Sequence, residues 1–198
     1  MTVSNTSPYL SPEEYLEAEN NSPIKHEYIQ GRIYAMTGAS DAHVTITANL
    51  LTLLRNHVRG SGCRVYVADM KVRIESLNLF YYPDLMVTCD PQDANFQYFK
   101  CYPSLIIEVL SPSTEAFDRG DKFSDYQELE TLQEYVLISQ NRQRIDSFRR
   151  NVEGRWELYS YRENQELELT SLNFTCSVAA VYEDVNFPET FNPTSRDV

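Results

Sequence analysis

The sequence predicts a mixed α/β fold in which helices pack against a central sheet. Apolar residues between 41 and 59 recur at helical spacing, whereas the short apolar run 85–87 is typical of a buried strand. Pro and Gly are spread too thinly to mark a linker, and 198 residues can bury a substantial core. We therefore expect a single domain over residues 1–198, with flexible ends at about 1–10 and 189–198.

Local sequence patterns predict the helices and strands that follow one another along the chain. Ser11, followed by Pro12 and Glu14, forms a capping box that begins a helix. Two β-prone runs hinged at Gln30-Gly31 predict a hairpin, and Gly60 ends the long helix. The expected elements are a helix at 11–20, a hairpin at 27–36, a helix at 41–59, one or two strands at 64–74, a strand at 84–87, a polar loop at 90–102, a strand at 105–108, a helix at 118–131, a strand at 135–139, and a hairpin of 145–148 with 156–161.

The charge balance limits what the surface can bind. A net charge of −12 is unsuited to gripping nucleic acid over the whole surface, because such binding depends on cations that displace phosphate counterions. Any nucleic-acid contact must be local or mediated by a metal. No apolar run approaches the roughly 20 residues that span a bilayer, and the polar start lacks the apolar core of a signal peptide. We expect a cytoplasmic protein without membrane contact.

Four cysteines are scattered along the chain, namely Cys63, Cys89, Cys101 and Cys176. The absence of a Cys-x-x-Cys pair argues against a zinc site. Nothing marks a secreted disulfide framework either. The sequence therefore predicts free, partly buried thiols.

Two carboxylates are attached to apolar runs that should form buried strands. Asp84 precedes the run 85–87, and Glu108 follows the run 105–107. Taken alone, Pro83-Asp84 is a turn-forming pair at the start of a strand. An isolated carboxylate removed from water is costly unless a cation meets it, and the simplest partner that two acids can share is a divalent metal. We therefore expect both acids in the active site.

Further motifs surround the two acids. The segments are Pro83-Asp84, Glu108-Val109-Leu110-Ser111-Pro112-Ser113-Thr114, Asp118-Arg119-Gly120-Asp121-Lys122-Phe123 and Glu134-Tyr135, with additional matches at Glu27, Gly31, Ala35-Met36-Thr37-Gly38, His43 and Asp69. Together they resemble the Uma-two family of restriction-endonuclease-like proteins, over roughly residues 11–139. The resemblance implies a PD-(D/E)XK nuclease fold: a mixed central sheet flanked by helices, with an N-terminal helix and hairpin and a C-terminal β-hairpin. It also implies a metal-dependent phosphodiesterase in which Asp84 and Glu108 hold Mg²⁺ or Mn²⁺.

One position departs from the superfamily pattern. Leu110 stands where the lysine of Glu-x-Lys is expected, and an apolar side chain cannot orient water or offset phosphate charge. The resemblance implies that Lys122, on the next helix, takes over this role. Asp118, Lys122 and Tyr126 would share one helix face at positions i, i+4 and i+8. The alternative is that Asp118 and Lys122 form an exposed ion pair that contributes only a few tenths of a kcal/mol.

Three further residues are accessory candidates. His43 lies in the first turn of the long helix, where it either neighbours a surface cap or points at the site, and the sequence leaves both alternatives open. Glu27 and Asp69 are acids on predicted strands, where polar-face or hydrogen-bonding roles are commoner than ligand roles. Ser111 and Ser113 lack a Gly-x-Ser-x-Gly elbow and a partnered His, so we interpret them as turn and helix-capping residues.

The C-terminal hairpin is the most basic stretch of this acidic chain. Its arginines are Arg142, Arg144, Arg149, Arg150 and Arg155. Such a run usually forms a solvated strand edge that resists aggregation. The alternative is a nucleic-acid-binding rim in which Arg142, Arg144, Arg149 and Arg150 contact phosphates.

Together with the family resemblance, these patterns lead us to expect a Mg²⁺- or Mn²⁺-dependent endonuclease that hydrolyses phosphodiester bonds of nucleic acid, with DNA as the first choice of substrate. Asp84 and Glu108 would hold the metal, and Lys122 would orient the nucleophile or neutralise developing charge. A second hypothesis is a catalytically inactive nuclease fold that serves as a binding or assembly module, because the motif lysine is missing and the chain is acidic. A third is a metal hydrolase acting on a small phosphoester. The resemblance also suggests a homodimer, since nucleases of this fold commonly pair to cut two strands.

Overall fold

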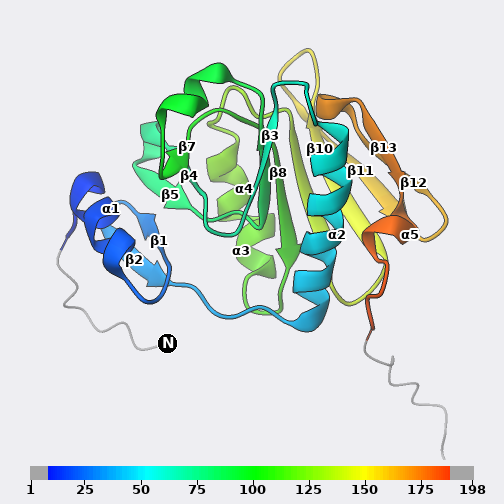
Figure 1. The fold of residues 1–198 in the computed structure, drawn as a ribbon, viewed down its shortest axis with the longest axis horizontal. Coiled ribbons are helices and arrows are strands. Elements are labelled where there is room, and N and C mark those ends of the chain that lie inside the picture. Colours follow the sequence, from blue (N-terminus) through cyan, green and yellow to red (C-terminus); the bar gives the residue numbers. More distant parts are fainter. Residues whose placement is uncertain (1–8, 188–198) are drawn as a thin grey trace, which may run out of the picture.

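The computed structural model describes residues 9–187 and confirms the predicted mixed α/β class (Figure 1). The predicted flexible ends fall almost entirely outside the described residues. The helices are α1 (Pro12–Asn21), α2 (Asp41–His57), α3 (Glu115–Arg119), α4 (Asp121–Tyr126) and α5 (Val178–Val181). The strands are β1 (His26–Ile29), β2 (Arg32–Ala35), β3 (Arg64–Val67), β4 (Lys71–Ile74), β5 (Leu79–Tyr81), β6 (Leu85–Thr88), β7 (Phe99–Lys100), β8 (Pro103–Leu110), β9 (Glu134–Ser139), β10 (Arg144–Arg150), β11 (Trp156–Arg162), β12 (Glu166–Leu169) and β13 (Phe174–Ser177).

A six-stranded sheet in the order β11-β10-β9-β8-β6-β3 forms the centre of the molecule. Strands β8 and β9 run parallel and the other neighbours run antiparallel, so the predicted mixed sheet is confirmed. The helix α2 lies along one face of this sheet (Figure 1), and its buried residues Ile46, Leu50 and Leu54 pack in the core on that face. The long amphipathic segment is therefore a core helix, as its periodicity predicts.

The other face of this sheet packs against a second sheet, in the order β2-β1-β5-β4-β7, and against α4. Val72 and Tyr81 come from the second sheet, and Tyr126 comes from α4. They are buried against Met86 and Ile106 of the central sheet. The central sheet is thus covered on both faces, which explains why its inner strands β6, β8 and β9 are largely apolar and buried.

Strand alternation on β8 decides where its carboxylate points. Leu105, Ile107 and Val109 belong to the core on the α2 side, whereas Ile106 and Leu110 belong to the core on the opposite side. Because successive side chains of a strand point to opposite faces, Glu108 faces α4 and the second sheet. This geometry places the acid opposite the helix that carries the predicted lysine.

The predicted helix at 118–131 is wrong in its extent. Two short helices, α3 and α4, are separated at Gly120, whose φ of −115° and ψ of −101° are not helical. Leu129 and Leu132 lie beyond the end of α4 and are buried in the core, so their apolar spacing reflects core contacts rather than a helix. No helix in the described part of the chain is both long enough and apolar enough to cross a bilayer.

The hairpin β12–β13 is absent from the sequence-based prediction. The available signal was the alternation of Leu167 and Leu169 with glutamates, since both leucines are fully buried. The turn of this hairpin ends in left-handed Asn173 (φ 50°), and the β4–β5 turn ends in the same way at Asn78 (φ 57°). Both turns carry the sequence Ser-Leu-Asn, and asparagine tolerates this conformation better than most residues.

Cys63 and Cys89 form a disulfide, so the prediction of free thiols is wrong for this pair. Strands β3 and β6 are antiparallel with Arg64 opposite Thr88, which brings the two flanking cysteines together. This pairing joins residues 26 positions apart, and sequence spacing alone does not reveal it. The other two cysteines are free and partly buried, as predicted.

Replacing Cys63 and Cys89 together with Ser should lower the free energy of unfolding by about 3 kcal/mol, because the disulfide restricts the unfolded chain over a separation of 26 residues. Urea unfolding of the oxidised wild type and the double variant measures this difference. A thiol reductant should destabilise the wild type and leave the double variant unchanged. Equal urea midpoints for oxidised and reduced wild type would contradict the prediction.

Candidate active site

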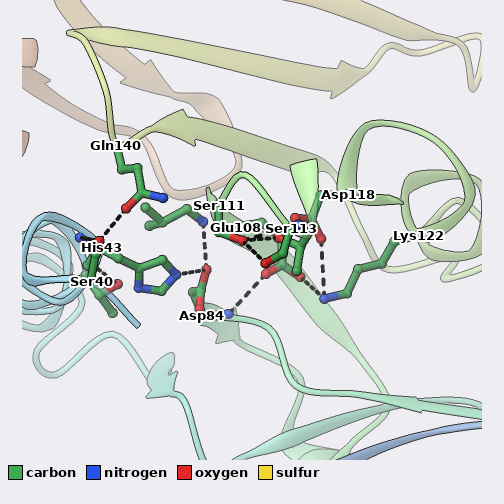
Figure 2. A network of polar contacts seen from close by, with 12 residues as sticks. Ser40, His43, Asp84, Glu108, Ser111, Ser113, Asp118, Lys122 and Gln140 are labelled. Atoms are coloured by element: carbon green, nitrogen blue, oxygen red, sulfur yellow. Dashed lines mark hydrogen bonds and ion pairs between the residues drawn. The ribbon is translucent and has the colours of Figure 1, made fainter. Parts of the chain in front are cut away.

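The two acids predicted to bind metal lie side by side. Asp84 precedes β6, and β6 pairs with β8 so that Leu85 lies opposite Ile107. The N–H of Asp84 donates to Glu108 Oε2 at 3.3 Å, and the N–H of Val109 donates to Asp84 Oδ2 at 2.7 Å (Figure 2). The side chain of Glu108 is 4% exposed and that of Asp84 is 22% exposed. The structure therefore joins a buried acid to a partly accessible one.

Lys122 reaches Glu108 and Asp118 from α4. Its Nζ lies 2.9 Å from Glu108 Oε1 and 3.7 Å from Asp118 Oδ1, and its side chain is 6% exposed. Asp118 and Lys122 are therefore not the exposed ion pair that the sequence left open as an alternative, because both side chains are buried. Tyr126 donates its hydroxyl to the same Glu108 oxygen at 3.1 Å. The face shared by Asp118, Lys122 and Tyr126 converges on Glu108 despite the break at Gly120.

Glu27 joins the site from the N-terminal hairpin. Strand β1 pairs with β5 next to the segment that leads to Asp84. Glu27 Oε1 lies 3.1 Å from Lys122 Nζ and accepts the N–H of Tyr82 at 3.3 Å. This accessory candidate therefore contacts both the predicted lysine and the backbone beside Asp84.

Negative charge dominates the surroundings of Lys122. Burial raises the pKa of Glu108 well above its ordinary value; Lys122 opposes this rise, and Asp118 and Asp84 add to it. Burial also raises the pKa of Asp118. Burial by itself would lower the pKa of Lys122, but the carboxylates of Glu108, Glu27 and Asp118 outweigh it and raise that pKa. The lysine is therefore charged, and a divalent cation would offset the remaining excess of negative charge.

His43 points at the site, which decides between the two alternatives left by the sequence. Its Nε2 lies 3.1 Å from Asp84 Oδ2. Burial lowers the pKa of His43, yet the hydrogen bond and charge of Asp84 prevail and raise it. Ser40, the N-cap of α2, accepts the N–H of His43 and donates to Gln140. Figure 2 shows these residues approaching Asp84 from the side opposite Lys122.

Asp69 lies outside this cluster. It follows β3 in the turn that leads to β4, its side chain is 76% exposed, and it pairs with Lys25. The turn interrupts the predicted run of strand residues at this point, so the acid faces solvent. We therefore leave Asp69 out of the candidate site, where it becomes a suitable control position.

The arginines of the C-terminal hairpin are largely engaged in internal contacts. Arg149 Nε donates to Glu134 Oε1 at 2.8 Å, and its side chain is 12% exposed. Arg150 donates to the carbonyl oxygen of Gln127 at 2.6 Å. Arg144 pairs with a buried aspartate on its own strand. These contacts favour a structural role in the hairpin over a phosphate-binding rim.

Arg149→Ala should lower the free energy of unfolding by about 2 kcal/mol, because the fully buried carboxylate of Glu134 loses its guanidinium partner. The exposed Arg142 forms no ion pair within the described residues, so Arg142→Ala should change stability by less than about 0.5 kcal/mol. Urea unfolding measures both values. If Arg149 instead binds phosphate, its removal will leave stability intact and flatten the salt dependence of DNA binding.

Sequence reasoning did not assign several residues that contact the site. Asp118 and Tyr126 carried a signal, since both lie at helical spacing from Lys122. Tyr82 and Gln140 carried none, because their positions depend on pairings between segments that are distant in the sequence.

Comparisons with known proteins identify the family of this chain. The model of the Uma2 family, described as "Putative restriction endonuclease", matches residues 12–179. In Synechocystis sp. (strain ATCC 27184 / PCC 6803 / Kazusa), uncharacterized protein slr1290 is 43% identical over 180 residues, which cover 91% of this chain and 95% of the relative. Uncharacterized protein sll1609 of the same organism is 36% identical over 173 residues, which cover 86% of this chain and 98% of the relative.

A solved structure shares the fold. It is a "putative nuclease belonging to DUF820" from Anabaena variabilis ATCC 29413, which superposes with a TM-score of 0.72 at 17% identity and covers 87% of this chain and 97% of that one. This match confirms the predicted restriction-endonuclease-like fold class. Because the family model spans most of the sequence and two relatives match it over nearly their whole length, the chain belongs to the Uma2 family, the family that its motifs predict.

Proposed function

We propose that the protein is a Mg²⁺- or Mn²⁺-dependent endonuclease that hydrolyses phosphodiester bonds in DNA. The observation that carries this proposal is the position of Lys122 Nζ, 2.9 Å from Glu108 Oε1 and beside the pair that Glu108 forms with Asp84. Two acids and an ammonium therefore meet in one place, although Leu110 breaks the Glu-x-Lys motif in the sequence. The family description as a restriction endonuclease is consistent with this chemistry.

The donor atoms suit a hard divalent cation. Asp84 Oδ1 accepts no hydrogen bond from the described residues, and Glu108 Oε2 accepts only the 3.3 Å bond from the N–H of Asp84. Within residues 9–187, no three His, Cys, Asp or Glu side chains are arranged to hold a metal. One or two carboxylates, with water and substrate oxygens completing the shell, are the usual ligands of Mg²⁺. Asp84 and Glu108 would therefore hold the ion together with the substrate phosphate.

When bound, the ion would supply Lewis-acid chemistry at the scissile phosphate. Lys122 would neutralise the negative charge that develops there, because its raised pKa keeps the ammonium protonated. Glu27 and Glu108 hold this ammonium from two different strands. His43 and the N–H of Val109 both contact Asp84 Oδ2, so they orient the carboxylate while Oδ1 stays available.

A second candidate is a catalytically inactive nuclease fold that acts as a binding or assembly module. The net charge of −12 favours it, because an acidic surface repels nucleic acid. The internal contacts of Arg149 and Arg150 favour it as well, since they leave fewer hairpin cations for phosphates.

A cleavage assay separates the two candidates. Purified protein, freed of host nucleases, is incubated with supercoiled, linear and single-stranded DNA in Mg²⁺, Mn²⁺ or EDTA. The proposal expects cleavage that requires metal, stops in Asp84→Asn and persists in Asp69→Asn. Absence of cleavage by the wild type favours the inactive module. If Asp84→Asn still cleaves DNA, the active site does not depend on Asp84 and lies elsewhere in the protein.

We also propose that the enzyme acts as a homodimer, because two such sites would cut both strands of a duplex. Light scattering of the purified protein tests the assembly. A mass of two chains supports it, and a mass of one chain at concentrations used for cleavage contradicts it.

A further inference from the structure

A second buried polar cluster adjoins the candidate active site. Its centre is Glu19 on α1, whose side chain is 4% exposed. Glu19 Oε1 accepts the N–H of His26 at 2.8 Å and the hydroxyl of Tyr82 at 3.0 Å. The other oxygen, Oε2, lies 3.0 Å from His26 Nδ1. One carboxylate of the N-terminal helix therefore holds two separate segments of the chain.

Tyr82 links Glu19 to a buried lysine. The hydroxyl of Tyr82 accepts a hydrogen bond from Lys71 Nζ at 3.2 Å, and both residues are almost fully buried. Burial lowers the pKa of Lys71, and attraction by Glu19 opposes that decrease. Two buried groups of opposite charge are thus connected through one phenol hydroxyl.

Both segments held by Glu19 carry residues of the site. Only Pro83 separates Tyr82 from Asp84, and its ring fixes the backbone φ angle between them. The N–H of Tyr82 also donates to Glu27 Oε1 at 3.3 Å, and Glu27 directly follows His26 on β1. A movement of Glu19 would therefore displace Asp84 and Glu27 together.

Hydrogen bonds and aromatic packing together join α1 to β1, where Tyr15 stacks on Tyr28 with ring centroids 4.9 Å apart. A cavity of about 210 Å³ borders Glu19 and His26 and is lined also by Tyr15 and Ile33. Tyr15 donates its hydroxyl to the carbonyl oxygen of His26 at 2.6 Å, which adds another link between α1 and β1. The hydrogen bonds of Glu19 and Tyr15 therefore add to the packing at this junction.

We infer that Glu19 and Tyr82 are positioning residues of the active site, which set the placement of Asp84 relative to Glu27 and hence to Lys122. The inference rests on the proposed nuclease function for its effect on rate, but the positioning itself can be measured without metal or substrate. Displacing a catalytic group by about 1 Å can lower the rate roughly 100-fold. The hydrogen bonds of Glu19 and Tyr82, which hold the segments that carry Asp84 and Glu27, would therefore affect the rate.

Three variants test the inference. Tyr82→Phe deletes the bridging hydroxyl and keeps the ring, and Glu19→Gln keeps the shape and removes the charge. Tyr28→Phe is the matched control, because Tyr28 is equally buried on β1 and its hydroxyl donates to the carbonyl oxygen of Leu10 at 2.9 Å. The hydroxyl of Tyr28 contacts no residue of the candidate site.

The first measurement is hydrogen exchange of single amides in metal-free protein, followed by NMR. The N–H groups of Tyr82, Asp84 and Val109 each donate to a carboxylate of the site. In both test variants these amides should exchange roughly fivefold faster, which is the effect of losing one net hydrogen bond on a local opening. The control Tyr28→Phe should leave them unchanged after correction for global stability. Equal exchange in test and control variants overturns the inference.

The second measurement is steady-state cleavage. Misplacement of the acids should lower kcat by roughly 10- to 100-fold in Tyr82→Phe and Glu19→Gln with KM unchanged, because the groups that bind substrate remain. Unchanged kcat in both variants of an active enzyme overturns the catalytic role. If the wild type cuts no nucleic acid, the proposed function fails, and amide exchange alone decides whether the cluster positions Asp84.

Discussion

Asp84→Asn and Glu108→Gln should each abolish metal-dependent cleavage and lower the affinity for Mn²⁺ by about 100-fold or more. Each variant keeps the shape of the side chain and loses a charged oxygen ligand, and even the loss of an outer partner of a metal site costs about 10- to 100-fold. Calorimetry on metal-free protein measures the affinity, and the cleavage assay measures the rate. Unchanged Mn²⁺ binding in both variants would show that this pair does not hold the metal.

Asp69→Asn supplies the matched control for both substitutions. It makes the same chemical change in an acid that is 76% exposed and paired with Lys25. This variant should keep the metal affinity and the rate of the wild type. If Asp69→Asn lost as much metal affinity and cleavage rate as Asp84→Asn, the effect of both substitutions would come from the change in overall charge.

Glu108→Gln should not destabilise the metal-free protein. Burial raises the pKa of Glu108 in the folded state, so this carboxylate lowers stability as the pH rises above its unfolded pKa of about 4.3. Lys122 keeps its partner Glu27 at 3.1 Å, so no ammonium is left unpaired. The thermal midpoint in EDTA at neutral pH should equal or exceed that of the wild type. A drop of several degrees would indicate a structural role for Glu108.

The acids of the site could be predicted because strand chemistry makes them conspicuous. Glu108 follows three apolar residues and belongs to a strand that is buried on both faces, and such positions seldom carry charge without a partner. Lys122 came from the family resemblance, which implies a lysine on the next helix where Leu110 breaks the motif, and its helical spacing from Asp118 is compatible with that position. For the two acids, the signal lay within a few residues of the site residue.

The remaining contacts could not be predicted because they depend on distant pairings. Glu27 meets Lys122 only because β1 pairs with β5. Glu19 meets Tyr82 only because α1 packs against these two strands. The same limit applied to Arg149, whose partner Glu134 lies on the neighbouring strand and is fully buried. A basic run in the sequence therefore does not distinguish a phosphate rim from internal ion pairs.

Leu110 shows why a relocated lysine is compatible with this fold. Its side chain is buried between the central sheet and α4, on the same face as Glu108. Because α4 packs against this face, Lys122 can bring an ammonium to Glu108 without any residue of β8 supplying one. The proposed mechanism requires only that a charge stand at this position, whichever segment carries it.

Lys122→Met should lower the single-turnover cleavage rate by roughly 100-fold or more while metal and DNA binding remain nearly unchanged. Methionine keeps much of the stem and deletes the ammonium that lies 2.9 Å from Glu108 Oε1. Lys122→Arg should not restore the rate fully, because a planar guanidinium cannot replace a compact ammonium enclosed by Glu108, Glu27 and Asp118. DNA binding is measured separately in Ca²⁺, so that a lost rate is not mistaken for lost affinity.

Lys100→Met separates the loss of a buried ammonium from the loss of catalysis. Lys100 is also almost fully buried, but its Nζ donates to the carbonyl oxygen of Asp93 at 2.7 Å in the connection between β6 and β7. Its replacement should lower stability and leave the rate per folded molecule unchanged, whereas Lys122→Met should lower that rate. Equal slowing of both variants would trace the effect to folding, and full activity of Lys122→Met would show that the relocated lysine takes no part in the reaction.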